Sequence, residues 1–246
     1  MEKKSTTESG ISTNVANFDK LTGVIIGFGN RYNPGVARLT VNALQEQSVH
    51  VKTSINEVDD SMAHVIIDEG HRQEQFSLLL PLATRIQAST KFFGMVESTS
   101  KHVKEIVRKI RGKRVHSLES EAAKAGDKPT KHISVSQVSF TEQIEHLNQL
   151  IMLLAADPAY KPTEADMKID GLRDYYDRLG VVNDACVETN RLLEEARERR
   201  NELLYTPVTG MIDTALAVKE YVKFAFGVKS PEYKEVYHIT FKKKSI

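Results

Sequence analysis

Apolar residues recur at intervals of three and four along two long stretches of the chain, a spacing typical of amphipathic helices. In the first stretch they are Val51, Ile55, Val58, Met62, Val65, Phe76 and Leu79, and in the second they are Tyr176, Leu179, Cys186, Leu193 and Leu204. The positions between them are largely charged, as in residues 194–200. We therefore expect an all-α protein in which one stripe of each long helix faces a core.

Several local signals predict where helices begin and end. Ser139 with Glu142 three residues later forms a capping-box sequence, and Pro34 and Pro162 suit first helical turns. Thr206 followed by Pro207 predicts a new helix or a kink. The turns within 60–75 and 185–207 are not marked clearly, and we place breaks at Gly70 and Asn190.

Short sequences recur in the same order in the two halves of the chain, which indicates an internal repeat. The matched residues are Ile11, Ser12, Phe18, Tyr32, Pro34, Leu44, Pro81 and Ile86 with Ile133, Ser134, Phe140, Tyr160, Pro162, Leu172, Pro207 and Ile212. We assign copy one to 11–114 and copy two to 133–244, with a polar linker at 115–132 and a disordered N-terminus at 1–10. The expected architecture is an antiparallel helical bundle of about six helices built from two tandem repeats.

One short segment changes period. Tyr237, Ile239 and Phe241 alternate with polar residues, which is typical of a strand. A lone strand needs a partner, and a duplicated unit can place equivalent segments side by side. We therefore expect residues 104–111 and 234–241 to form a short terminal two-stranded pairing or a pair of extended arms.

The composition is that of an ordinary globular protein. Of 246 residues, 40% are hydrophobic and 27% are charged, and 34 basic against 33 acidic residues give a net charge of +1. The hydrophobic and charged fractions exclude wholesale disorder. The net charge near zero gives no global reason to expect nucleic acid or an anionic membrane as a partner. The single cysteine excludes an internal disulfide. The first ten residues are polar and lack the apolar core of a secretory signal, and no apolar run approaches the length of a membrane span. We expect a cytoplasmic protein that does not bind membranes.

No motif assigns a chemical activity. Gly27–Asn30 reads Gly-Phe-Gly-Asn, which lacks the third glycine of a dinucleotide site. His64, Asp68 and His71 can share a helix face, but no further ligand stands at a familiar spacing. Cys186 suits a small core residue better than a nucleophile. We therefore assign no catalytic residue, no metal and no cofactor, and the sequence favours a non-enzymatic protein without excluding an enzyme.

Two features are candidates for binding. Arg72 and Arg200 occupy matching places on the apolar stripes. A charge in such a place must form an ion pair, extend to solvent or bind a ligand. The segment 101–114 carries seven basic residues against one glutamate. They are Lys101, Lys104, Arg108, Lys109, Arg111, Lys113 and Arg114. Such a patch can hold phosphates, although no aromatic residue interleaves to stack on bases, and a solvated helix end is the plainer interpretation.

The end of copy two carries a pattern that resembles a known group of proteins. Phe226, Gly227, Ser230, Pro231, Tyr233 and Lys234 form a Phe-Gly, Ser-Pro, Tyr-Lys sequence. It is similar to the end of an uncharacterised family of helical proteins from Bacteroidetes-type bacteria. The resemblance covers mainly the last 45 or so residues. Copy one departs from it, with Thr99 in place of Pro231. The resemblance implies a bacterial source and a domain of unknown function, and it brings no catalytic residue.

Three hypotheses for function follow. The leading one is a non-enzymatic helical interaction or scaffold protein, because duplicated amphipathic helices can bind partner helices or self-associate. The second is a nucleic-acid-associated protein that uses the basic 101–114 segment. The third is an enzyme with a site between the two copies, which a fold class cannot exclude.

Overall fold

The structure is a computed structural model that describes residues 6–112 and 139–242. These residues are almost entirely helical and contain no β-strand, so the predicted all-α class is confirmed. The helices are α1 (Thr6–Gly27), α2 (Val41–Ser77), α3 (Leu79–Phe92), α4 (Glu97–Ile110), α5 (Phe140–Ala156), α6 (Ile169–Tyr205), α7 (Met211–Phe226) and α8 (Pro231–Tyr237). Two short 3₁₀ helices, Gly29–Arg31 and Ala37–Leu39, lie between α1 and α2. The structure thus has more helices than the six or so expected.

The chain forms two compact units that do not coincide with the two predicted copies. The first unit consists of Met1–His64 and Asn190–Ile246, and the second consists of Val65–Thr189. Both boundaries fall inside long helices, so α2 runs from the first unit into the second and α6 runs back. Each unit therefore takes helices from both halves of the sequence.

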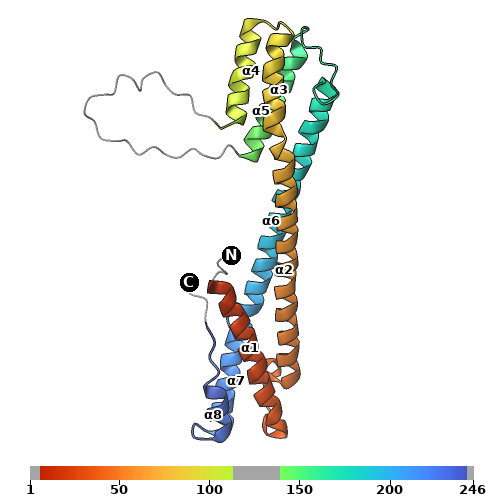
Figure 1. The fold of residues 1–246 in the computed structure, drawn as a ribbon. Helices are drawn as coiled ribbons and strands as arrows, with labels where there is room; N and C mark the ends of the chain where they lie inside the picture. The colour runs from red at the N-terminus through yellow and green to blue at the C-terminus, as the bar shows by residue number, and fades with distance from the viewer. Residues whose placement is uncertain (1–5, 113–138, 243–246) are drawn as a thin grey trace, which may run out of the picture. The chain divides into compact units, whose positions relative to one another are not determined.

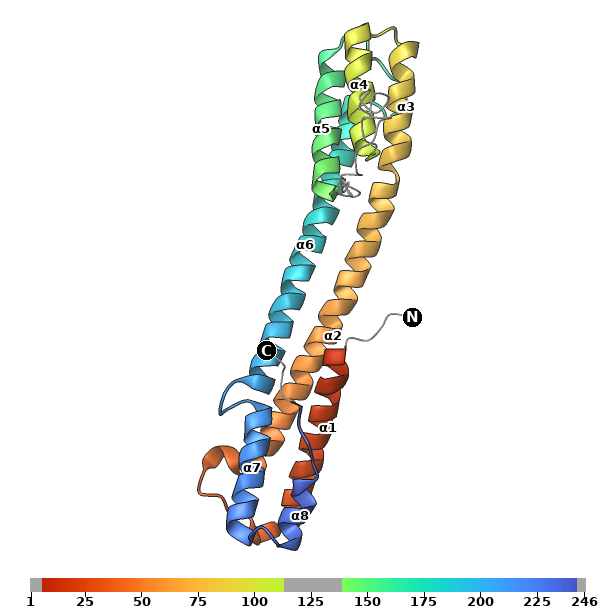
Figure 2. The same ribbon diagram turned by 90° about the vertical axis from the view of Figure 1, so that its left-hand side faces the viewer.

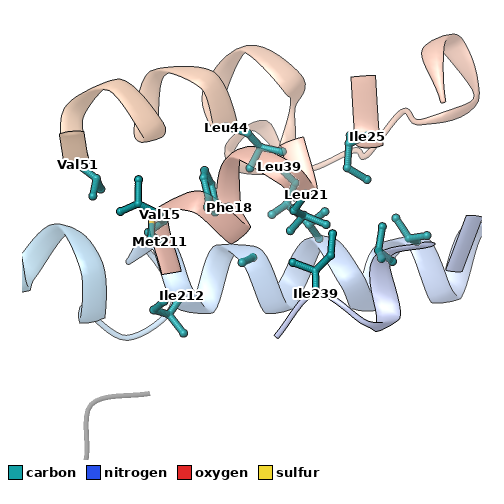
Figure 3. Packing of buried hydrophobic residues seen from close by; sticks show 14 of the residues in the cluster. Val15, Phe18, Leu21, Ile25, Leu39, Leu44, Val51, Met211, Ile212 and Ile239 are labelled. Atoms are coloured by element: carbon teal, nitrogen blue, oxygen red, sulfur yellow. The ribbon is translucent and has the colours of Figure 1, made fainter. Parts of the chain in front are cut away.

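The first unit is built around α1 and α7, with α8 and one end each of α2 and α6 (Figure 1). Phe18, Leu21 and Ile25 on α1 are fully buried at helical spacing and belong to one core cluster with Met211 and Ile212 of α7, and Met211 lies beside Val15 of α1 (Figure 3). This burial of large side chains is the main stabilising term for the unit.

The second unit packs α3, α4 and α5 against the other ends of the long helices (Figure 2). Its core comes from five helices and contains Leu79, Ile86, Val103, Val107, Leu147, Leu150, Leu172 and Leu179. Helix α4 is the most strongly amphipathic of these helices, with three buried apolar residues at helical spacing and a basic opposite face. That division determines which side of α4 meets solvent.

The predicted stripes on the two long helices are confirmed in most positions. Val51, Val58 and Val65 are buried on α2, whereas Met62 is partly exposed. The breaks expected at Gly70 and Asn190 are wrong, because α2 and α6 each continue unbroken through these residues. A single glycine in a helix costs only about 1 kcal/mol, which packing of the helix readily offsets.

The helix ends agree with some sequence signals and not with others. Ser139 and Glu142 form the predicted capping box at the start of α5. Pro34 and Pro162, expected in first turns, instead lie in loops before α2 and α6. Residues 6–10, expected to be disordered, belong to α1, which begins at Thr6. Residues 1–5 and the predicted linker 115–132 lie outside the described residues.

In each of the loops before α2 and α6, a tyrosine hydroxyl bonds to a backbone carbonyl later in the same loop. The Tyr32 hydroxyl donates to the Leu39 carbonyl at 2.7 Å, and the Tyr160 hydroxyl donates to the Met167 carbonyl, also at 2.7 Å. Each bond spans seven residues. A buried hydroxyl needs a partner, so the two loops use the same solution to the same requirement.

The expected two-stranded pairing is wrong for the described residues. Residues 104–110 belong to helix α4, and residues 234–237 belong to helix α8. After His238 the chain has no regular secondary structure, and Ile239 is buried whereas Tyr237 is largely exposed. The alternation of apolar and polar residues therefore corresponds to no strand in this segment.

Side chains replace that strand. Asn14 on α1 donates to the Lys242 carbonyl and accepts from the Lys242 amide, both at 2.8 Å. Asn17 donates to the Thr240 carbonyl at 2.7 Å. Lys219 on α7 donates to the carbonyls of Tyr237 and Ile239 at 3.0 and 2.8 Å. The C-terminal tail, residues 238–242, is thereby held by two helices, which satisfies backbone groups that a strand would otherwise pair.

Within the ranges 6–112 and 139–242, none of the helices combines the length and the apolar character needed to cross a lipid bilayer.

Candidate functional site

Arg72, one of the two predicted binding residues, lies on α2 in the second unit. Its guanidinium carbon is 4.2 Å from the centre of the Phe140 ring, at the start of α5. Its Nε atom is buried and has no hydrogen-bond partner among the described residues. The charge of Arg72 is thus satisfied mainly through the aromatic face, an arrangement that contributes about 0.5–2 kcal/mol. This contact explains Arg72 as a residue that fastens α5 to α2.

Arg200, the other candidate, lies on α6 in the first unit. Only 8% of it is exposed, and its Nη2 atom is 3.5 Å from the Asn201 side-chain oxygen. Burial raises the pKa of the nearby Tyr205, and the positive charge of Arg200 opposes that rise. The two arginines belong to different units, and neither lines any of the four hollows described below.

The basic segment forms a defined hollow on the second unit. Its volume is about 380 Å³, and it lies beside α3 and α4. We call it the basic hollow, and it is lined by Gln87, Lys101, Lys104, Glu105, Arg108 and Arg111. Four of the seven predicted basic residues therefore share one site. Lys109 is exposed on α4 but does not line the hollow, and Lys113 and Arg114 lie outside the described residues.

The four cations of the basic hollow share one helical face because of their spacing. Lys101, Lys104, Arg108 and Arg111 follow at steps of three, four and three residues, on a face beside the one that carries the buried Val103, Val107 and Ile110. Like charges at such steps repel one another and weaken a helix by a few tenths of a kcal/mol each. The site therefore carries a local positive potential that an anion would relieve.

A second hollow in the second unit lies beside the start of α3. Its volume is about 390 Å³, and its polar lining includes Arg85, Asp166, Asp174 and Arg178. Arg85 and Asp166 form an exposed ion pair, and the hydrogen bond from Arg85 lowers the pKa of the Asp166 carboxyl. An adjoining hollow of about 460 Å³ shares Arg178. The ion pair engages two of these four charged side chains, Arg85 and Asp166.

One hollow of the first unit has no cluster of like charges in its lining. A hollow of about 440 Å³ lies beside the end of α6, where Arg199 and Glu202 face Gln47 and Thr209. Arg199 reaches Glu57 at 3.8 Å, and Gln47 donates to the Thr209 carbonyl at 2.8 Å. The first contact joins α2 to α6 and the second joins α2 to the loop before α7, so the polar groups around this hollow hold the unit together.

The most exposed large apolar side chains form a repeated pair. Phe92 is 84% exposed near the end of α3, and Phe224 is 85% exposed near the end of α7. Four residues later, Val96 and Val228 are also largely exposed. We call Phe92 with Val96, and Phe224 with Val228, the exposed apolar pairs. Each unit thus presents one pair at the end of its central short helix.

The remaining candidates are one cysteine and one group of possible metal ligands. Cys186 is fully buried on α6, and burial raises the pKa of its thiol, so the reactive thiolate is disfavoured. His64, Asp68 and His71 lie on α2 and belong to no metal-ligand group within the described parts of the chain.

Sequence reasoning missed three of the residues that define these surfaces. Gln87 lines the basic hollow from α3, and the spacing of residues along the sequence does not predict that α3 contacts α4. Phe92 and Phe224 lie in two similar sequences, Lys-Phe-Phe-Gly at 91–94 and Lys-Phe-Ala-Phe-Gly at 223–227. The repetition of phenylalanine was the available signal, because an aromatic residue at a polar helix position needs a reason.

Comparisons with models of protein families, with curated proteins and with solved structures each found no match for this chain.

Proposed function

We propose that this chain is a non-enzymatic interaction protein, built from two tandem copies of one helical unit, that binds a partner protein through the exposed apolar pairs. The observation that carries the proposal is the matching exposure of Phe92 and Phe224 at equivalent places in the two copies. Aromatic rings left in water are unfavourable, and they are the side chains that most often anchor protein interfaces.

The duplication is supported by equivalent elements rather than by sequence alone. Helices α2 and α6 are each 37 residues long, and each follows a loop closed by a tyrosine hydroxyl. Each long helix is then followed by a shorter helix that ends beside an exposed phenylalanine. The same order of elements twice, with the same hydrogen bond in the same loop, is what duplication of one unit would produce.

The proposal also includes the family resemblance, because several residues of the Phe-Gly, Ser-Pro, Tyr-Lys sequence end α7 or begin α8. Gly227 has a φ of +91° at the end of α7, a conformation that glycine adopts without strain. Ser230 accepts a hydrogen bond from the Tyr233 amide, with Pro231 in the first turn of α8. We propose membership of the uncharacterised Bacteroidetes-type family and a cytoplasmic location on this basis and on the single, buried cysteine.

The test replaces the two phenylalanines. Phe92→Ser and Phe224→Ser, singly and together, should leave the helix content and melting temperature unchanged because both rings are exposed. Proteins captured from a lysate of the source organism, identified by mass spectrometry, should be lost progressively from the single to the double variant. Sedimentation velocity of the purified chain alone shows in parallel whether the partner is a second copy.

The matched controls are Val49→Ser in the first unit and Val187→Ser in the second, both at exposed apolar positions. They should keep every captured protein. Capture and sedimentation that do not differ between the double variant and the intact protein would overturn the proposal.

The two alternatives differ in their support. No arrangement of described side chains favours the enzyme hypothesis. A phosphate-bearing partner, in contrast, is favoured by one observation, the grouping of four cations in the basic hollow.

A further inference from the structure

We propose that the basic hollow binds a small ligand that carries several linked phosphate groups, and that it recognises the phosphates alone. The inference is independent of the apolar pairs. It rests on four cations and one amide that line a hollow of about 380 Å³, a volume within the range of small-molecule sites.

The cations are largely available to a ligand. Lys101 pairs with Glu97 at 2.9 Å, but both side chains are highly exposed, so this pair contributes little. Arg111 donates to the Thr84 hydroxyl at 2.9 Å, which orients its guanidinium without neutralising it. Lys104 and Arg108 form no ion pair with any described residue. The hollow thus combines an oriented guanidinium group with positive charges that no strong ion pair neutralises.

The lining matches condensed phosphate better than other anions. Two guanidinium groups can each donate two parallel hydrogen bonds to phosphate oxygens, and the two lysines add compact charges. With Glu105 included, the lining carries a net charge of +3, from four basic side chains and one acid. A single carboxylate would leave most of that charge unmatched, whereas a di- or triphosphate would match it.

The lining does not suit recognition of nucleic-acid bases. None of the residues around the hollow is aromatic, and stacking on aromatic rings is the main way in which proteins hold single-stranded bases. A nucleotide should therefore bind no better than the same phosphates without a base.

Within residues 6–64 and 190–242, the described part of the first unit, no counterpart to this site is found. Helix α8 has seven residues, half the length of the 14-residue α4, and the chain then continues as the C-terminal tail. Among the described residues, a basic row on a helix of this length therefore occurs only in the second unit. Because the first unit folds without such a basic row in its described part, we attribute the row in the second unit to ligand binding and not to stability of the fold.

Calorimetric titration at low salt tests the proposal with inorganic tripolyphosphate, ATP and a single-stranded thymidine oligonucleotide as probes. Tripolyphosphate and ATP should bind with affinities within about threefold of each other, both weakened by added salt. The triple variant Lys104→Gln, Arg108→Gln, Arg111→Gln should bind tripolyphosphate at least about tenfold more weakly. The control Lys161→Gln, Lys168→Gln, Arg173→Gln removes the same charge from exposed positions elsewhere in the second unit and should bind normally.

The variant Glu105→Gln distinguishes a phosphate-binding site from a basic helix face that has only a structural role. Removing this carboxylate from the hollow should tighten tripolyphosphate binding several-fold, because it removes repulsion of the ligand. Absence of binding at low salt, equal loss in the control variant, or weaker binding after Glu105→Gln would each overturn the proposal. Tighter binding of the oligonucleotide than of tripolyphosphate would overturn it in favour of a nucleic-acid partner.

Discussion

Individual residues in this protein are constrained most tightly where backbone approaches backbone. A Cβ atom added to Gly171, in the first turn of α6, would lie 2.1 Å from the Ala165 carbonyl oxygen. Gly180, on the same helix, has no atom within 4 Å of such a Cβ. The two glycines look alike in the sequence but differ in what surrounds them.

Gly171→Ala should therefore destabilise the protein by about 1–3 kcal/mol, because the loop before α6 must move to admit a methyl group. Gly180→Ala is the matched control and should be neutral or stabilising by up to about 1 kcal/mol through better helix propensity. Denaturant unfolding of both variants measures the difference. Equal stability of the two variants would show that the loop is free to shift.

The buried tyrosines predict a dependence of stability on alkaline pH. Burial raises the pKa of Tyr160 and of Tyr175 to about 12, and it raises the pKa of Tyr32 further. The folded state keeps protons that the unfolded state loses near pH 10, so these groups leave stability unchanged below pH 10. Between pH 10 and 12 each should lower the free energy of unfolding by up to about 1.4 kcal/mol per pH unit.

Tyrosinate absorbance and thermal unfolding across this range measure the effect together. Tyr160→Phe removes one titrating group, so it should reduce the slope of stability against pH above pH 10. A full complement of tyrosinate at pH 11 in a protein that is still folded would contradict the assignment.

At the scale of elements, the C-terminal tail shows how a segment without regular structure can be held firmly. Its carbonyl and amide groups bond to Asn14, Asn17 and Lys219, and Ile239 enters the core of the first unit (Figure 3). Burying one such side chain contributes about 1.5–3 kcal/mol. The tail is therefore an integral part of the first unit.

Deleting residues 238–246 should lower the melting temperature by several degrees, because Ile239 burial is lost and the fully buried Asn14 is left without its partners. Deleting residues 243–246 alone keeps every bond named here and is the control. Differential scanning calorimetry of both proteins gives the comparison. An unchanged melting temperature after the longer deletion would mean that the tail does not stabilise the unit.

At the scale of the molecule, each unit is assembled from both halves of the chain. The core of the first unit joins Phe18 and Leu44 to Leu204 and Met211, and the core of the second joins segments from α2 through α6. Because α2 and α6 each belong to both units, neither half of the sequence contains a complete core.

Separate fragments 1–125 and 126–246 should consequently lack cooperative unfolding when each is studied alone. Mixing them should restore helix content and a sharp thermal transition, because the missing core segments are then supplied from the other fragment. Circular dichroism and size-exclusion chromatography follow both steps. A fragment that alone unfolds cooperatively as a monomer would refute this account of the cores.

The sequence by itself determined the properties that depend on local chemistry. Helical spacing of apolar residues identified the stripes of α2 and α6, and Ser139 with Glu142 identified the start of α5. Burial of Cys186 also followed, because Leu179 and Leu193 stand two helical turns before and after it on the same stripe. These signals act within a few residues, so no knowledge of the fold was needed to read them.

Only the tertiary structure decided which segments meet. Spacing predicted a strand near the C-terminus, but not that the side chain of Asn14, more than two hundred residues away, would bond to the backbone of the tail. It grouped seven basic residues but not the four that share a hollow with Gln87. Contacts between helices depend on how their faces pack in three dimensions, and a pattern along one helix records only that a face is apolar, not which face it will meet.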